Sequence, residues 1–259
     1  MSDSASAPHH VFGVDIGGSG IKGAPVDVEA GAMLAERHRI PTPSPATPEA
    51  VAGVVAEVME AHGWSGPLGC TVPSRVRDGV TETAVNIDPA WKGCNARDLI
   101  AEATGHPCAV LNDADAAGIA EMAFGAGKGH EGTVLLLTFG TGIGSALFRE
   151  GVLVPNAELG SARWKQDQIV EKFSADSARS RDHLTWERWA KRRVQPTLEY
   201  LEHLLSPDLL IVGGGVSKPR KWGLFAHFLD TRAELRPAAL GNEAGIIGAA
   251  YVASRSLEA

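Results

Sequence analysis

An acid, several glycines and a lysine lie close together in residues 15–22, which read DIGGSGIK. Apolar residues precede this segment, and small and apolar residues follow it, so it is predicted to be the turn of a β-hairpin. Glycine has no Cβ, so backbone N–H groups in such a turn can approach phosphate oxygens closely. Lys22 would add positive charge, and Asp15 is a carboxylate of the kind that Mg²⁺ prefers. An ordinary tight turn would explain neither the acid nor the lysine, so we predict a phosphate-binding hairpin.

The same residues also match a different glycine motif, because 18–23 read GSGIKG and satisfy GxGxxG. That motif binds a dinucleotide only when it follows a strand and opens a helix. Here Ala24 and Pro25 come next, and Pro25 lacks the N–H that a continuing helix needs. The chain also has no GxxxxGK[ST] motif. Neither a dinucleotide-binding fold nor a P-loop enzyme is predicted.

A second segment repeats the form of the first, since residues 135–146 read LLLTFGTGIGSA. Both segments have an apolar strand, a glycine-rich turn and a strand of small residues. Two such hairpins predict a duplicated domain, in which each copy presents a glycine turn to one shared cleft. The residues predicted to contact donor phosphates are Gly17, Gly18, Ser19, Gly20 and Lys22 in the first hairpin, and Thr138, Gly140, Thr141 and Gly142 in the second.

Asn112 and Asp113 stand where a short predicted strand, 108–111, ends and a helix begins. A side chain at such a position reaches into a cleft. A hydroxyl that attacks phosphorus needs a carboxylate within hydrogen-bond reach of its proton, together with alignment and charge neutralisation. Asp113 is a candidate for that base. From the residues alone, an N-cap for the following helix is an equally good interpretation.

Strands and helices alternate along the chain, which predicts the α/β class. A strand is expected over 34–40. Thr47, Pro48 and Glu49 are a helix start, with Thr47 as the N-cap, and that helix is expected to run to about His62. A long helix is predicted over 184–205, and a helix of small residues over 243–255, capped by Asn242. Residues 161–181 are polar and irregular, and predict no regular element.

Composition excludes several classes of protein. The chain has 259 residues, of which 44% are hydrophobic and 21% charged, which is typical of globular domains. No apolar run is long enough to span a membrane, and residues 1–10 resemble a frayed tail more than a signal peptide. The net charge of −7 argues against nucleic acid as a partner. Three cysteines without a CxxC motif favour a reduced, cytoplasmic protein without a cysteine-based metal site.

Four motifs, taken in order, resemble those of the ROK family of sugar kinases: DIGGSGIK at 15–22, NDADAA at 112–117, LTFGTGIGS at 137–145 and VGGGVS at 212–217. Over about residues 11–252 the chain is most similar to the family's actinobacterial polyphosphate glucokinases. The resemblance implies an actin-like (RNase H-like) α/β fold of two domains with an interdomain cleft. It also implies transfer of a phosphoryl group from polyphosphate or ATP, with Mg²⁺, to the 6-hydroxyl of glucose. The hairpins resemble the family's phosphate-1 and phosphate-2 loops, and its adenosine loop corresponds to Gly213, Gly214 and Gly215.

The resemblance assigns further roles. It implies that Asp113 is the catalytic base, and that the sugar is bound by Asn86, Asp88, Asn112 and Glu158. Turn residues (Asn86 and Asp88) and a surface acid (Glu158) are the plainer interpretations. The expected domains are 11–112 together with the helix 242–255, and 113–241. A homodimer is expected, and no zinc, because the His and Cys cluster of many ROK proteins is absent.

The acceptor motif departs from the family pattern. After Glu158-Leu159-Gly160 the family has His-Leu-Glu, whereas this chain has Ser161, Ala162 and Arg163. Ser74 also stands where the family usually has Gly. The alternatives are therefore a changed acceptor, either another hexose or a cyclitol, and a weakly active sugar-binding relative. A ROK repressor is disfavoured because the first hairpin begins at Val11, without room for a helix-turn-helix.

Two basic segments, 191–193 and 218–221, are candidates for a polyphosphate groove, with a solvated charged face as the alternative. Lys128 has the same two interpretations. The aromatic residues Trp186, Trp189 and Trp222 are expected in the core or at an interface.

Overall fold

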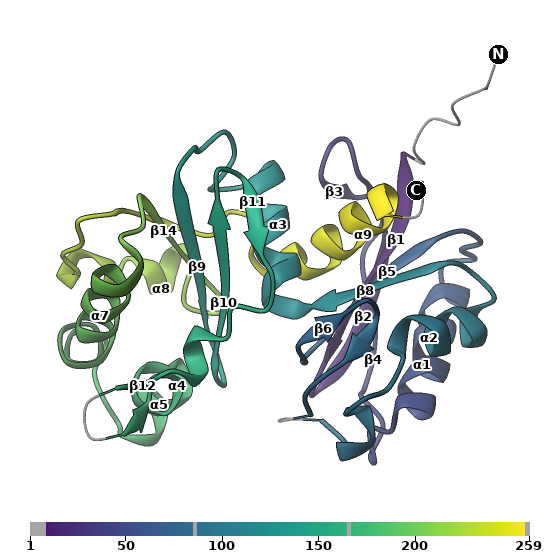
Figure 1. Ribbon diagram of the computed structural model, residues 1–259, viewed down its shortest axis with the longest axis horizontal. Coiled ribbons are helices and arrows are strands. Elements are labelled where there is room, and N and C mark those ends of the chain that lie inside the picture. The colour runs from purple at the N-terminus through teal and green to yellow at the C-terminus, as the bar shows by residue number, and fades with distance from the viewer. Residues whose placement is uncertain (1–8, 85–86, 165–166, 257–259) are drawn as a thin grey trace. The chain divides into compact units, whose positions relative to one another are not determined.

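The computed structural model describes residues 9–84, 87–164 and 167–256. The chain divides into two compact units, whose elements are labelled in Figure 1. The first unit holds the chain up to Ala120 and again from Glu243, and the second is Glu121–Asn242. The domain bounds expected from the sequence, 11–112 with 242–255 and 113–241, stay predictions.

The first unit is built on a mixed sheet with helices. Its strands are β1 (His10–Gly17), β2 (Gly20–Asp27), β3 (Ala32–Met33), β4 (His38–Ile40), β5 (Leu68–Val72) and β8 (Cys108–Asn112), with a separate hairpin of β6 (Val76–Arg77) and β7 (Val80–Thr81). Its helices are α1 (Pro48–Glu60), η1 (Pro89–Trp91), α2 (Ala96–Thr104) and α9 (Ala244–Ser256), together with most of α3 (Asp113–Phe124), whose last residues belong to the second unit.

The first sheet has the order β3-β2-β1-β5-β8, and β4 also pairs with β2. β1 and β2 are antiparallel, whereas β1, β5 and β8 are parallel. α1 starts as expected, since the Thr47 hydroxyl accepts the Ala50 N–H at 3.3 Å and Pro48 is the first helical residue. α1 and α2 pack together on one side of this sheet and α9 lies on the other (Figure 1).

Two glycines let α9 lie directly on the sheet backbone. A Cβ at Gly13 would stand 2.0 Å from the Ile246 carbonyl oxygen, and one at Gly69 would stand 1.9 Å from that of Ala249. No side chain fits at either distance, so these positions of β1 and β5 require glycine. The apolar core on the other face includes Val51 and Val55 of α1 and Cys70 of β5. Burial raises the pKa of the Cys70 thiol well above its usual value.

The second unit is built on a second mixed sheet. Its strands are β9 (Thr133–Phe139), β10 (Ile143–Arg149), β11 (Val152–Val154), β14 (Leu209–Gly213) and β15 (Glu234–Pro237), with a separate hairpin of β12 (Arg163–Trp164) and β13 (Gln168–Ile169). Its helical elements are η2 (Leu159–Ser161), α4 (Val170–Ser174), α5 (Asp176–Arg181), α6 (Trp186–Trp189), η3 (Ala190–Val194), α7 (Gln195–Leu205), α8 (Pro219–Trp222), η4 (Ala226–Phe228) and η5 (Gly241–Glu243).

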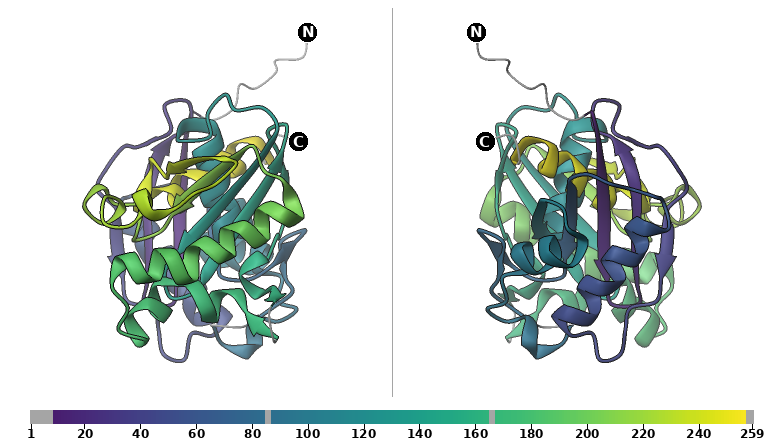
Figure 2. Two further views of the ribbon diagram at one scale, coloured as in Figure 1. Left: turned by 90° about the vertical axis from the view of Figure 1, so that its left-hand side faces the viewer. Right: turned by 90° about the vertical axis from the view of Figure 1, so that its right-hand side faces the viewer.

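The second sheet has the order β11-β10-β9-β14-β15. β9 and β10 are antiparallel, whereas β9, β14 and β15 are parallel, so the arrangement β10-β9-β14-β15 repeats β2-β1-β5-β8 of the first unit. The long helix expected over 184–205 is formed by α6, the π-helical η3 and α7. It covers one face of this sheet (Figure 2), where Leu198 and Leu201 pack with Leu135 and Leu210. The duplication inferred from the two glycine segments therefore extends to whole sheets.

Three local details differ from what the sequence indicated. Of the strand expected over 34–40, only His38–Ile40 is a strand, β4, and residues 34–37 form a bend and irregular backbone after β3. Residues 161–181 contain α4 and α5 as well as the β12–β13 hairpin. The last helix begins at Ala244, after the 3₁₀ turn η5.

Candidate active site

The first glycine segment is a hairpin turn, as expected. β1 and β2 pair from His10 opposite Asp27 to Gly17 opposite Gly20, which leaves Gly18 and Ser19 as a two-residue turn. Strand β2 begins at Gly20 and continues through Lys22. Since a strand follows the glycines where a dinucleotide fold requires a helix, the GxGxxG match is not a dinucleotide-binding motif here.

Asp15 and Lys22 form an ion pair beside this turn. They are opposite each other in the β1–β2 register, and Lys22 Nζ is 3.0 Å from Asp15 Oδ2. The hydroxyl of Thr71, opposite Asp15 on β5, donates to Asp15 Oδ1 at 3.1 Å. Both side chains keep about a fifth of their surface exposed, 22% for Asp15 and 24% for Lys22. The lysine expected to face phosphate therefore has a carboxylate as its neighbour.

Two residues that the sequence did not single out brace the turn. Arg39 of β4 donates from Nη2 to the Ser19 carbonyl at 2.6 Å, and the Thr42 hydroxyl donates to the Gly17 carbonyl at 2.5 Å. The guanidinium lies so close to Gly20 that a Cβ there would stand 2.6 Å from Arg39 Nε. The pairing of β4 with β2 brings these residues to the turn. This pairing could not be predicted from the local sequence.

Asn112 makes the N-cap of α3, which was one of the two interpretations of Asp113. The buried Asn112 is the N-cap, because its Oδ1 accepts the N–H of Ala114 at 2.9 Å and that of Asp115 at 3.1 Å. Asp113 is the first residue of α3 and its side chain is exposed, although its Oδ1 also accepts the Ala114 N–H at 2.8 Å. Asp113 is thus an exposed carboxylate at the N-terminus of a helix that Asn112 caps.

Ser74 connects the cap of α3 to another part of the first unit. Its carbonyl accepts Asn112 Nδ2 at 3.1 Å, while its buried hydroxyl donates to the Thr83 carbonyl at 2.7 Å and accepts the Thr83 N–H at 3.2 Å. The Thr83 hydroxyl in turn accepts the N–H of Arg75 at 3.1 Å. The serine that replaces the family's usual glycine is therefore part of a hydrogen-bond network at the end of β5.

The expected sugar-binding pair at 86–88 is described in part. Asn86 lies outside the described residues. Asp88 is half-buried and caps the 3₁₀ turn η1, because its Oδ1 accepts the Ala90 N–H at 2.9 Å. Asp88 thus has the turn role that was the plainer interpretation.

The second glycine segment forms the turn between β9 and β10, with Phe139 opposite Ile143. The Gly140 N–H donates to the Gly142 carbonyl at 3.0 Å. The turn is held from the side by Ser177 of α5, whose N–H donates to the Gly140 carbonyl at 3.0 Å and whose hydroxyl donates to the Thr141 carbonyl at 2.6 Å. Ser177 was missed by sequence reasoning because it lies in the segment 161–181, which showed no periodicity.

The two glycines of this turn differ in their surroundings. A Cβ at Gly142 would stand 2.4 Å from Glu171 Oε2, whereas one at Gly140 would have no described atom within 4 Å. Space above Gly140 is therefore open, and space above Gly142 is occupied by a carboxylate of α4. Of the two positions, Gly140 is the one with open space on the side where a Cβ would point.

The triple glycine lies next to the second hairpin within the same unit. Gly213 ends β14 and is paired with Thr138 of β9. Gly214 has φ of +80°, and a Cβ there would stand 2.6 Å from the Phe139 carbonyl, so this position requires glycine. A Cβ at Gly215 would stand 3.9 Å from Lys221 Nζ. The carboxyl ends of two parallel strands thus bring Thr138 and the loop 213–215 together.

The acceptor loop that contains Glu158 is anchored to β10. The Ser145 hydroxyl donates to the Ala157 carbonyl and accepts the Leu159 N–H at 2.9 Å. A Cβ at Gly160 would stand 2.0 Å from the Ile143 carbonyl, so Gly160 allows η2 to lie against the start of β10. Glu158 precedes η2 and is exposed. Its position is therefore fixed by the same hairpin that carries Gly140.

The altered residues of this loop lie at the surface. Ser161 ends η2 and is exposed. Arg163 begins β12 and its Nη1 is 2.7 Å from Asp167 Oδ2, with 65% of its side chain exposed. The charge that Arg163 brings to this loop is thus matched by a local acid.

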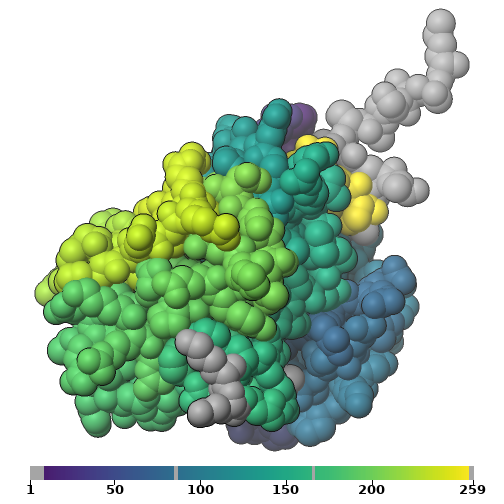
Figure 3. Space-filling view, turned by 60° about the vertical axis from the view of Figure 1, so that its left-hand side comes forward, coloured from purple at the N-terminus to yellow at the C-terminus, as the bar shows by residue number. Residues whose placement is uncertain are grey.

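The basic segments and the aromatic residues are all in the second unit. Figure 3 shows a face of this unit, with the segment after β14 in yellow-green and α7 in green. Lys191 is paired with Glu187 at 2.7 Å, whereas the described residues offer no ion pair to Lys218, Arg220 or Lys221. Trp189 is buried in the core, as expected, and Trp186 and Trp222 pack against it.

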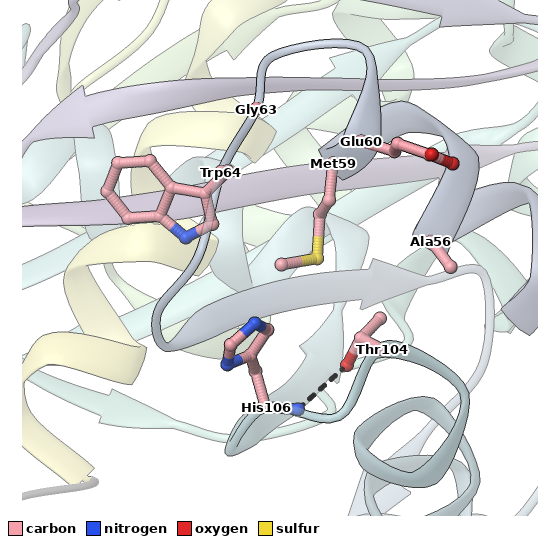
Figure 4. Close-up of a pocket in the computed structure, with 7 residues that line it drawn as sticks. All are labelled: Ala56, Met59, Glu60, Gly63, Trp64, Thr104 and His106. Atoms are coloured by element: carbon pink, nitrogen blue, oxygen red, sulfur yellow. Dashed lines mark hydrogen bonds between the residues drawn. The ribbon is translucent and has the colours of Figure 1, made fainter.

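A cavity of about 310 Å³ lies elsewhere in the first unit (Figure 4). It is lined by Ala56, Met59, Glu60, Gly63, Trp64, Thr104 and His106. These residues come from the last turns of α1 and α2 and from the segments that enter β5 and β8. The hairpin turn and Asp113 lie at the other ends of these parallel strands, so the cavity is separate from the candidate site.

Within the described part of the chain, no helix is long and apolar enough to cross a membrane. The same residues contain no group of three His, Cys, Asp or Glu side chains arranged to hold a metal ion.

Comparison with known proteins identifies a matching family and several relatives. A model of the ROK family matches residues 11–157. A polyphosphate glucokinase of Mycobacterium tuberculosis (strain H37Rv) is 48% identical over 248 residues, which cover 95% of this chain and 92% of the relative. One from Mycobacterium leprae is 46% identical over 98% of this chain and 78% of the relative.

Solved structures show the same relationship. The inorganic polyphosphate/ATP-glucomannokinase of Arthrobacter sp. strain KM matches with a TM-score of 0.89 and 43% identity, over 95% of this chain and 99% of that one. A ROK family glucokinase of Streptomyces griseus, solved with glucose and AMPPNP, matches with a TM-score of 0.79 and 26% identity, over 95% of this chain and 100% of that one. The expected actin-like α/β fold class is confirmed by these matches.

Proposed function

Because this chain belongs to the ROK family, we propose that it is a kinase that transfers a phosphoryl group from polyphosphate or ATP to the 6-hydroxyl of glucose. The product is glucose 6-phosphate. The main support for this proposal is the pair of glycine hairpins, β1–β2 and β9–β10, one in each of the two sheets. The names of the mycobacterial and Arthrobacter relatives supply the donor and the sugar.

Asp113 is proposed as the catalytic base. Its carboxylate is exposed and Asn112 caps the helix, which supports a role for Asp113 in taking the proton of the attacking hydroxyl. In the reaction the sugar O6 forms a bond to the terminal phosphorus, and the bond from that phosphorus to the bridging oxygen of the donor breaks. The O6 proton passes to Asp113, and the shortened donor leaves with the electron pair of the broken bond. General base catalysis of this kind contributes about 10²- to 10⁴-fold to rate.

Donor binding is assigned to the three glycine loops. Gly17, Gly18, Ser19 and Gly20 surround the first turn, Thr138, Gly140, Thr141 and Gly142 the second, and Gly213, Gly214 and Gly215 the third. Support comes from their geometry, since the first two are tight turns without bulky side chains and the third is paired with the second. Backbone N–H groups in such turns stabilise phosphate charge.

Sugar binding is assigned to Asn86, Asp88, Asn112 and Glu158. Amide and carboxylate groups suit neighbouring hydroxyls, since each offers two hydrogen-bonding atoms. For Asn112 the cap and the Ser74 contact already use Oδ1 and one Nδ2 hydrogen, which leaves the other Nδ2 hydrogen for a hydroxyl. Asn112 would therefore bind the sugar as a donor.

Mg²⁺ fits the residues at Asp15. A partly exposed carboxylate is a suitable ligand, and Mg²⁺ usually keeps several of its waters. Both oxygens of Asp15 already have protein partners, Lys22 and Thr71, so a water-mediated contact is the better fit. When bound, the ion would neutralise charge on the donor phosphates. The cytoplasmic location and the homodimer expected from the sequence stay predictions.

A changed acceptor is the second candidate function, and the altered loop favours it. Ser161 stands in place of the family's histidine, and Arg163 is engaged with Asp167. An acceptor hydroxyl that relies on the histidine would lose its partner here. Another hexose or a cyclitol would then be the preferred acceptor.

A coupled assay that crosses polyphosphate and ATP with a panel of sugars tests both functions. We expect turnover with glucose and at least one donor. A higher kcat/KM for another hexose or a cyclitol would favour the changed acceptor. Absence of turnover with every pair would overturn the kinase proposal.

A further inference from the structure

The charges at the first hairpin are arranged in one row across the sheet. Register pairing places Thr71 of β5 opposite Asp15, Asp15 opposite Lys22, and Lys22 opposite Arg39 of β4. Residues directly opposite each other on neighbouring strands have their side chains on the same face. This row therefore contains one negative and two positive charges on one face, next to the glycine turn.

Lys22 is the member of the row whose charge is already matched. Its ammonium is 3.0 Å from Asp15 Oδ2, and Asp15 is further held by the Thr71 hydroxyl at 3.1 Å. A phosphate that approached Lys22 would also approach the Asp15 carboxylate, which repels it. As a source of positive charge for the donor, Lys22 is weakened by this neighbour.

Arg39 is the other positively charged residue of the row. It is exposed, and among residues 9–84, 87–164 and 167–256 it forms no ion pair. Its Nη2 is 2.6 Å from the Ser19 carbonyl, at the apex of the turn. Nε, Cζ and Nη2 all lie within 2.7 Å of the place where a Cβ of Gly20 would be. The guanidinium is therefore held flat against the turn, and Gly20 is the residue that allows this.

A guanidinium held in this way suits an anion at the turn. It has five N–H donors, and the bond to Ser19 uses one of them. The planar fork matches two oxygens of a phosphate, which a lysine ammonium does not do. Backbone N–H groups of the turn and the remaining Arg39 donors lie within one small region.

We propose that Arg39, rather than Lys22, supplies the positive charge that holds a donor phosphate at the first hairpin. The ligand is a phosphate group of a phosphoanhydride chain, as in polyphosphate or a nucleoside triphosphate. The inference rests on the proposed function for the identity of the donor. It goes beyond that function in assigning a residue from another strand that no motif includes.

The test compares five variants with the wild type. One of them, Lys22→Gln, removes the other positive charge of the row. Arg39→Gln removes the charge and the fork, and Arg39→Lys restores the charge without the fork. Thr42→Val removes the other brace of the turn, the bond to the Gly17 carbonyl, and leaves all charges in place. Arg97→Gln is the control, because it removes an exposed arginine of the same unit that is paired with Asp98.

The readouts are the KM of each donor, the KM of glucose, and calorimetric binding of tripolyphosphate in the absence of sugar. We expect Arg39→Gln to raise donor KM and weaken tripolyphosphate binding about tenfold or more, which is typical of losing a charged hydrogen bond. Arg39→Lys should recover part of the loss. Glucose KM should change little, and Arg97→Gln should match the wild type. Added salt should weaken tripolyphosphate binding less in Arg39→Gln than in the wild type.

Three results would overturn the inference. Donor KM and tripolyphosphate binding within twofold of the wild type in Arg39→Gln would show that the arginine is not a ligand. An equal loss in Thr42→Val would show that bracing of the turn, and not charge, is what matters. A loss confined to Lys22→Gln would return the role to Lys22. If the wild type transfers no phosphate to any sugar, the proposed function fails, while the tripolyphosphate measurements still decide the role of Arg39.

Discussion

At the residue scale, the N-cap of α3 is Asn112, and Asp113 follows it as the first helical residue. Asn112 is buried and satisfies the first N–H groups of the helix, so Asp113 is not needed as the cap. Asp113 is exposed at the N-terminus of the helix, where a carboxylate is favoured. The sequence placed both residues correctly at the strand–helix junction. It could not assign the cap, because either side chain suits that position.

Replacement of Asp113 tests its role as the base. Asp113→Asn should lower kcat by about 100-fold or more, because an amide does not accept the proton of the hydroxyl. Donor KM should change only modestly. Because Asn112 still caps α3, the thermal midpoint should stay close to that of the wild type. Steady-state kinetics and thermal melting check both statements, and near wild-type turnover would remove Asp113 from catalysis.

Ser74 is expected to position the acceptor side of the first unit. Ser74→Ala keeps the carbonyl that accepts from Asn112 and removes the hydroxyl that joins Thr83. A buried group left without its partner costs about 1–3 kcal/mol, so stability should fall and glucose KM should rise while donor KM stays unchanged. Ser254→Ala, a buried serine of α9, is the matched control. Equal effects on glucose KM in both variants would contradict the positioning role.

At the element scale, the two hairpins reach similar geometry with different supports. The first turn is braced by Arg39 and Thr42 and the second by Ser177. The strand–turn–strand form was predictable, because apolar runs flank the glycines in both places. The braces were not predictable, because each depends on a tertiary contact. α4 and α5 have five and six residues, too few to show a helical period.

A side chain at Gly140 should disturb donor binding without disturbing the fold. Space above this residue is open, so Gly140→Val places its methyl groups where a phosphate would approach. Donor KM should rise at least tenfold, while the thermal midpoint is little changed. Gly142→Val is a less clean probe, because its Cβ must displace Glu171. Gly53→Ala, in an open position of α1, serves as control, and unchanged donor kinetics in Gly140→Val would make the hairpin repeat purely structural.

The altered acceptor loop gives a prediction for glucose affinity. An unmatched sugar hydroxyl costs about 1–3 kcal/mol, so glucose should bind weakly to the natural sequence. Ser161→His should lower glucose KM about tenfold and leave donor KM unchanged. Arg163→Glu is better left out, because it would place an acid beside Asp167. Tight glucose binding by the natural protein, with no gain from the histidine, would show that the loop has been rebuilt around the same sugar.

At the scale of the whole molecule, two sheets of matching topology each carry one glycine hairpin. The sequence predicted the duplication from residues 12–24 and 135–146, and the repeat of strand order extends it. It also predicted α1 from Thr47 and Pro48, and the long helix over 184–205. It did not predict the row from Thr71 to Arg39, because strand register depends on pairing between segments far apart in the chain.

Identification of the phosphorylated position tests the central claim most directly. The wild-type protein is incubated with glucose and polyphosphate or ATP, and the products are followed by phosphorus and proton NMR. We predict one phosphomonoester, coupled to the two protons on C6 of glucose, formed as the donor loses one phosphate per product, and no ester with 6-deoxyglucose. Release of inorganic phosphate without a sugar ester, or an ester at another position, would contradict the account.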